Sequence, residues 1–157
     1  MPAAVNLPIT QELQDAVVAV LGTRTALRDV AIVGRRKTNI VADIEEAIAT
    51  LGGICIVVLL PLPVEINPET PGPYIQKLEI RVRVIENQAL NESKPAAAEV
   101  IEEILVALHQ YNFPEKLEAF GLNLFTAAPR PIEEIPDPER TIYDVIFFTS
   151  CGYRPRA

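Results

Sequence analysis

The sequence predicts an α+β domain with a mainly antiparallel sheet packed against amphipathic helices. Residues 54–60 and 141–151 are rich in branched or aromatic side chains and apolar on both faces, which is typical of strands inside a sheet. Residues 78–84 alternate between apolar and charged side chains, so this strand buries one face only. Three other segments repeat apolar residues at helical spacing.

Each helical segment carries residues that suit its ends. Gly22 follows the first helix, Asn39 can cap the second, and Gly52 and Gly53 end it. Pro95 suits the first turn of the third helix, and Ser93 can cap it. The expected helices are residues 8–21, 39–51 and 96–109.

The segments between these elements are short strands or proline-rich connections. Residues 31–33 are a short strand ended by Gly34, and residues 122–126 are a further strand candidate. Five prolines make residues 61–73 a stiff extended loop or bent hairpin connection, which favours antiparallel pairing of the strands on either side. Residues 129–138 hold four prolines and several acids, and are expected to be an extended arm or long loop.

Length and composition indicate one globular domain. The chain has 157 residues, 49% apolar and 22% charged, so we expect a single domain, 1–157, with a proline-rich acidic arm at about 127–140. A domain of this length buries roughly 70% of the surface of its unfolded chain and needs no metal or disulfide to fold.

Charge and hydropathy argue against two classes of partner. The net charge of −7 gives no reason to expect direct binding to nucleic acid or to a membrane surface. The longest apolar run, residues 54–64, is interrupted by two prolines and is shorter than the roughly 20 residues of a spanning helix. Residues 1–6 lack a basic segment followed by an apolar run, so we expect no signal peptide and an intracellular protein.

The residues that usually carry chemistry are sparse. Cys55 and Cys151 lie in apolar surroundings, so we expect reduced core thiols, with an isolated disulfide as the alternative. His109 is the one histidine and lies near the end of a helix, where a positive charge interacts favourably with the helix dipole and needs no catalytic explanation. A structural zinc site needs about four Cys or His ligands, and this chain has two cysteines and one histidine. It also lacks a glycine-rich phosphate-binding loop. We therefore expect no catalytic residue, cofactor or metal.

Charge is distributed unevenly along the chain. Residues 1–37 hold five basic and three acidic residues, whereas residues 38–157 hold nine basic and eighteen acidic ones. The basic segment includes Arg35, Arg36 and Lys37. Either it is a solvated loop, or it contacts an acidic partner or an acidic face of a neighbouring copy. Adjacent acids do not converge on one point, so the acidic pairs fit solvated faces better than catalysis; these pairs are Glu45/Glu46, Glu102/Glu103 and Glu133/Glu134.

The order of elements resembles the small tail proteins of long-tailed bacteriophages and prophages, above all the tail terminator (tail completion) proteins and related minor tail proteins. In that family two strands form a hairpin, a helix packs on the sheet, and a last strand ends near the C-terminus. The helix at 39–51 and the acidic arm at 129–140 depart from the simplest members. The residues that carry the resemblance are 54–60, 78–87, 96–111 and 141–149.

The resemblance implies a tail-terminator-like fold and a structural function without catalytic residues. Such proteins form rings, commonly hexameric, that cap the tail tube and meet the head-completion proteins. It implies the bacterial host cytoplasm during assembly, and then the virion tail, as locations. A ring needs head-to-tail contacts that close, and surfaces of opposite sign suit such contacts. The candidate subunit-contact residues are Arg35, Arg36, Lys37, Glu79, Arg81, Arg83, Glu133 and Glu134.

Two other classes of function stay open at this stage. A small α+β ligand-binding or regulatory domain without enzymatic activity requires a deep pocket with convergent polar groups. An enzyme with carboxylate chemistry requires two distant acids that converge with a perturbed pKa.

Overall fold

The computed structural model describes residues 8–34, 40–50, 52–67, 74–109, 111, 125–127 and 132–153. The helices are α1 (Pro8–Gly22), α2 (Ile40–Thr50), α3 (Ala97–Leu108) and the 3-10 helix η1 (Thr25–Leu27). The described strands form one seven-stranded sheet. They are β1 (Ala31–Val33), β2 (Ile54–Val58), β3 (Leu62–Asn67), β4 (Tyr74–Glu86), β5 (Phe125–Ala127), β6 (Glu133–Ile135) and β7 (Thr141–Tyr153). The predicted α+β class with a mainly antiparallel sheet is confirmed.

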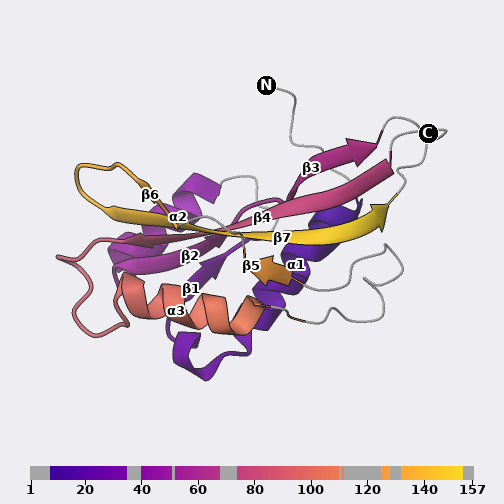
Figure 1. Ribbon diagram of the computed structural model, residues 1–157. Helices are drawn as coiled ribbons and strands as arrows, with labels where there is room; N and C mark the ends of the chain where they lie inside the picture. The colour runs from indigo at the N-terminus through magenta and orange to yellow at the C-terminus, as the bar shows by residue number, and fades with distance from the viewer. Residues whose placement is uncertain are drawn as a thin grey trace.

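The two 13-residue strands β4 and β7 form the centre of the sheet (Figure 1). They run antiparallel, from Glu86 opposite Thr141 to Ile75 opposite Tyr153. The other edge of β4 pairs antiparallel with two strands in succession. Residues 82–86 of β4 pair with β2, and residues 74–79 pair with β3. Strand β1 pairs parallel with β2, and β5 and β6 pair antiparallel with the outer edge of β7.

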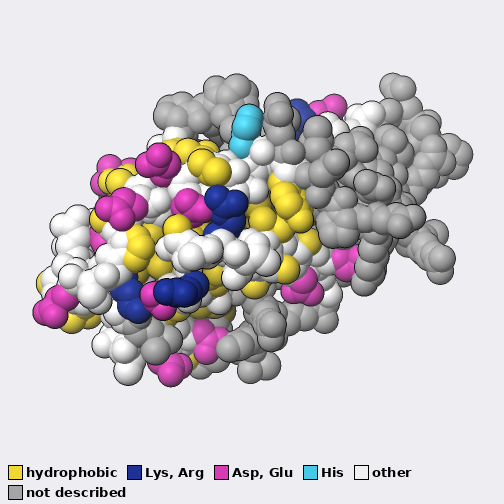
Figure 2. All heavy atoms as spheres, turned by 90° about the horizontal axis from the view of Figure 1, so that it is seen from below, with side chains coloured by type: hydrophobic (Ala, Val, Ile, Leu, Met, Phe, Trp, Pro, Cys, Tyr) yellow, Lys and Arg dark blue, Asp and Glu magenta, His cyan; other side chains and the backbone are white. Residues whose placement is uncertain are grey.

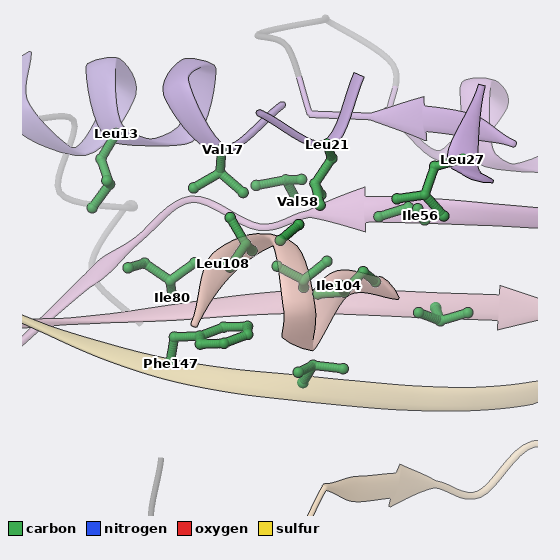
Figure 3. Packing of buried hydrophobic residues seen from close by; sticks show 14 of the residues in the cluster. Leu13, Val17, Leu21, Leu27, Ile56, Val58, Ile80, Ile104, Leu108 and Phe147 are labelled. Atoms are coloured by element: carbon green, nitrogen blue, oxygen red, sulfur yellow. The ribbon is translucent and has the colours of Figure 1, made fainter. Parts of the chain in front are cut away.

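Helices cover the two faces of the sheet unequally. Figure 1 shows α1 and α3 on one face and α2 on the other. The larger core joins α1 and α3 to the sheet; Figure 3 shows Val17, Ile104 and Phe147 among the side chains that meet there. The smaller core packs Ala47 and Ile48 of α2 on the other face, at one end of the sheet. The alternation of β4 thus places its apolar residues in the larger core, as predicted.

Helix α2 ends at a turn that requires glycine. Gly53 has φ +83°, and a Cβ there would lie 2.6 Å from the backbone nitrogen of Asn91. A side chain at this position would meet backbone that cannot move aside. The predicted stop after α2 is therefore confirmed, while Asn39, its expected cap, lies outside the described residues.

The proline-rich segment after β2 contains a strand that the sequence did not indicate. Within the expected 61–73 connection, residues 62–67 form β3, and residues 68–73 lie outside the described residues. Pro63 is tolerated because β3 pairs with β4 on one side only, and its register shifts near Pro63. An edge strand can lose one N–H donor without breaking a ladder on both sides.

One segment contains a strand that was not expected, and one further expectation needs correction. The arm at 129–138 contains strand β6, because residues 133–135 pair with β7. Helix α3 begins at Ala97 after an N-cap at Ala96 without a side-chain hydrogen bond, so neither Ser93 nor Pro95 has the expected role. The carbonyl of Pro95 instead accepts a hydrogen bond from the Asn91 side chain.

Candidate functional site

Four of the predicted contact residues gather on the sheet face that carries α2, in the part that this helix does not cover. Glu79, Arg81 and Arg83 lie on β4, and Glu133 of β6 lies beside them across β7. Odd positions of β4 share one face, which explains the grouping. Glu134 is exposed and, as the next residue along β6, belongs to the opposite face. Arg35, Arg36 and Lys37 lie outside the described residues.

The centre of this group is Asp144 on β7, which the sequence analysis did not select. Its side chain has 0% exposure. Arg83 donates from Nε to Oδ1 at 2.8 Å and from Nη2 to Oδ2 at 3.1 Å. Arg81 donates from Nη1 to Oδ2 at 3.1 Å. A buried carboxylate needs charged or hydrogen-bonding partners, and Asp144 has both.

A signal for Asp144 was present in the sequence. It is the one acid between Ile142 and Phe148, a run that is otherwise apolar. Such a residue on a strand buried on both faces requires a cationic partner on a neighbouring strand. Only β4 among the predicted strands offers arginines at alternate positions.

Arg81 connects three strands through its guanidinium group. Besides its bond to Asp144, Arg81 donates from Nη1 to Oε2 of Glu133 on β6 at 2.9 Å. Its Nε lies 3.5 Å from Oε2 of Glu79. Burial acts to lower the pKa of Arg81, but its hydrogen bonds to Glu133 and Asp144 act in the opposite direction and leave the pKa above its ordinary value. Arg81 therefore stays charged and fixes β6 against the sheet.

These contacts join the basic strand face and the acidic arm within one chain. The sequence predicted that such surfaces meet between copies, and the pairing of Arg81 with Glu133 shows that they fit each other. Contact between copies through these residues stays a prediction.

A second ion pair joins the turn before β7 to α2. Arg140 donates from Nη1 to Glu45 Oε1 at 2.9 Å and from Nη2 to Glu45 Oε2 at 2.7 Å. The hydrogen bond and charge of Arg140 lower the pKa of Glu45 below its ordinary value of 4.5. Asp137 closes the same turn, because its Oδ1 accepts the backbone N–H groups of Glu139 and Arg140. The sequence analysis did not anticipate this contact.

An open groove of about 610 Å³ lies beside this turn. Its lining comes from the start of the loop after β4 and from the turn between β6 and β7, including Asn87, Glu134, Asp137 and Glu139. Because it is open and formed by turn residues, it differs from the deep pocket that the ligand-binding alternative requires.

The cysteines and the histidine lie apart from the charged group. Both cysteines are free and buried, as expected. Burial raises the pKa of the Cys55 thiol to about 11. Cys151 donates from Sγ to the carbonyl oxygen of Ile75 at 3.1 Å. His109 is exposed at the end of α3.

The described part of the chain offers no ready site for a metal ion. Within it, no three His, Cys, Asp or Glu side chains are grouped so that they could hold one. None of its helices has the length and apolar character needed to cross a bilayer.

The described part of one face of the molecule is mixed in character. Figure 2, seen from below the view of Figure 1, shows acidic, basic and hydrophobic side chains interspersed. An ion pair between Arg24 Nε and Glu103 Oε1, at 2.6 Å, joins the residue before η1 to α3. Edge strand β3 exposes three large apolar residues, Leu62, Val64 and Ile66.

Comparison with known proteins shows that the fold occurs in a solved structure. Neither a model of a known protein family nor a curated protein matches the chain. Among solved structures, a chain described as "Virion of native gene transfer agent (GTA) particle" superposes with a TM-score of 0.61 at 12% sequence identity. The match covers 97% of this chain and 99% of that chain. The two chains therefore share a fold over almost their whole lengths.

Proposed function

We propose that this chain is a non-enzymatic structural protein of a phage-like virion. The observation that carries the proposal is the fold shared with a chain of the gene transfer agent particle, over nearly the full length of both. A match confined to a common core motif would leave large parts of one chain uncovered. Coverage of both chains instead supports a common role, although fold alone does not fix function.

Within such a particle, we propose a ring-forming tail terminator or minor tail protein at the head–tail junction. The order of elements that resembles tail terminator proteins supports this assignment. The partners would be further copies of the chain, the tail tube and head-completion proteins, and the location would be the host cytoplasm during assembly and then the virion tail. Basic and acidic surfaces on one chain suit head-to-tail contacts that close into a ring.

Self-association of the purified protein tests the ring. Light scattering and negative-stain microscopy at high protein concentration and low salt should show rings that dissociate as salt is added, because exposed ion pairs are screened. Reversing the charge of Arg35 and Arg36 should weaken the rings. Reversing the charge of Glu92, which is exposed in the loop before α3 and lies outside the basic segment, is the control and should leave them intact. A wild type that stays monomeric under all these conditions counts against ring formation by the protein alone.

A further inference from the structure

Residues 132–140, named the strap from here on, cover part of the outer edge of β7 without burying a side chain. Every strap residue is exposed or half-buried. Strand β6 contributes three residue pairs, from Glu133 opposite Asp144 to Ile135 opposite Ile142. Hydrophobic burial is the main source of stability in folded proteins, so the strap is held chiefly by backbone pairing and by ion pairs.

The ion pairs of the strap lie at its two ends. Glu133 binds Arg81 on β4, and Arg140 binds Glu45 on α2. Both pairs include a side chain that is more than 40% exposed, so water and salt compete with them. A short segment with few buried contacts is the kind that opens locally while the rest of the fold stays intact.

Strand β7, whose outer edge the strap covers, is held in the sheet by contacts that do not involve the strap. It pairs antiparallel with β4 from Thr141 to Tyr153, and Asp144, Val145 and Ile146 are buried. Opening would free those backbone N–H and C=O groups of residues 142–144 that point toward β6 and away from β4. Such an edge can bind another strand. The strand that already fits it in sequence and register is β6, from this copy or from another.

The turn between β6 and β7 can serve as the hinge. Pro136 and Pro138 favour extended backbone at the residues before them. An extended hinge carries β6 away from its own β7 and toward a neighbour. Exchange of an identical element between copies needs no new contact surface, because each copy regains from its neighbour what it gives up.

We propose that, in the assembled protein, β6 of one copy pairs with β7 of the next, so that Glu133 binds Arg81 of that neighbour. The inference rests on the self-association proposed above and gives its contact. One-way exchange passes the strap from each copy to the next, which is the head-to-tail arrangement that a ring requires.

Paired cysteine variants distinguish exchange from pairing within one chain. Glu134 lies directly opposite Tyr143 in the register of β6 and β7, so a cysteine at each position can form a disulfide. Glu134→Cys and Tyr143→Cys are made as separate proteins, mixed, assembled at high concentration and oxidised. We expect a covalent dimer whose cross-linked peptide joins positions 134 and 143. The double variant in one chain, oxidised when dilute, should link within the monomer and shows that the geometry permits the bond.

A matched mixture controls for chance contact. Glu92→Cys, an exposed position in the loop before α3, is mixed with Tyr143→Cys in the same way. Equal cross-linking in this mixture overturns the exchange. If scattering and microscopy show assembled rings but the 134–143 mixture gives no cross-linked dimer, the exchange is wrong, whereas the proposed ring formation is supported. If no assembly occurs at any concentration, both the exchange and ring formation by the protein alone are wrong.

Discussion

Arg83 and Asp144 face each other across β4 and β7, and the guanidinium group binds both carboxylate oxygens, at 2.8 and 3.1 Å. Asp144 has 0% exposure, whereas the Arg83 side chain retains 32%. The pair also fixes the register of the two central strands. If β7 slipped by one residue relative to β4, its side chains would change faces and Asp144 would lie in the apolar core.

Removing Arg83 should therefore destabilise the fold strongly. Arg83→Met takes away two of the three hydrogen bonds that the arginines donate to Asp144 and leaves a buried charge poorly compensated, at a cost of about 3 kcal/mol in the free energy of unfolding. Urea denaturation measures the change. Arg28→Met removes an exposed arginine and should stay within about 0.5 kcal/mol of the wild type. Equal stability of the two variants would show that the buried pair does not support the fold.

Ile104 tests the packing of α3 on the sheet. Its side chain has 0% exposure in the larger core, so Ile104→Ala should lower the free energy of unfolding by about 2–5 kcal/mol. Val106 lies two residues further on α3 with 62% exposure, and Val106→Ala should have little effect. An unfolding midpoint unchanged by Ile104→Ala would mean that the buried face of α3 is assigned wrongly.

The ion pair of Glu45 and Arg140 should make stability depend on pH. The folded-state pKa of Glu45 lies below its ordinary value of 4.5, so the pair stabilises the protein above that pH and loses its effect as the pH falls through the folded pKa. The stability difference between wild type and Glu45→Gln should thus be constant near neutrality and shrink in acid.

Chemical denaturation at pH 7 and at pH 3 measures this difference. Glu46→Gln, at the exposed neighbouring position, is the control and should give a difference from wild type that changes less with pH. A wild-type advantage over Glu45→Gln that is as large at pH 3 as at pH 7 contradicts the assignment of the pair.

The two cysteines should be inert in the folded protein. Burial keeps the Cys55 thiol protonated, with a pKa of about 11, and Cys151 is also buried. At pH 8, a thiol reagent should label neither residue in the native state and both in denaturant. Labelling of one thiol at the rate of a free cysteine, in protein that is still folded, would show that the residue is accessible.

The sequence predicts long elements with strong periodicity and fails where local preferences conflict with tertiary contacts. The alternation of β4 and the apolar character of β7 identify both central strands. Strand β3 was missed because Pro63 opposes strand pairing, and only its place at the edge of β4 permits it. Strand β6 was missed because three residues carry too little pattern to outweigh the prolines around them.

The candidate site shows the same limit. Glu79, Arg81, Arg83 and Glu133 were selected for their charge, and the fold brings them together. Their common partner, Asp144, was missed because the sequence analysis weighed groups of charges and not a single acid within an apolar strand. The bond between Glu45 and Arg140 spans 95 positions of the chain and depends equally on tertiary structure.

Electron microscopy of particles made with and without this protein tests the central claim most directly. Phage-like particles are purified from the producing cells and from the same cells with the coding sequence deleted. We predict that the protein is a component of the intact particles, and that its loss gives tails of abnormal length that do not join heads. Restoring the coding sequence should restore normal particles. Particles that lack the protein and still have normal tails joined to heads would contradict the claim.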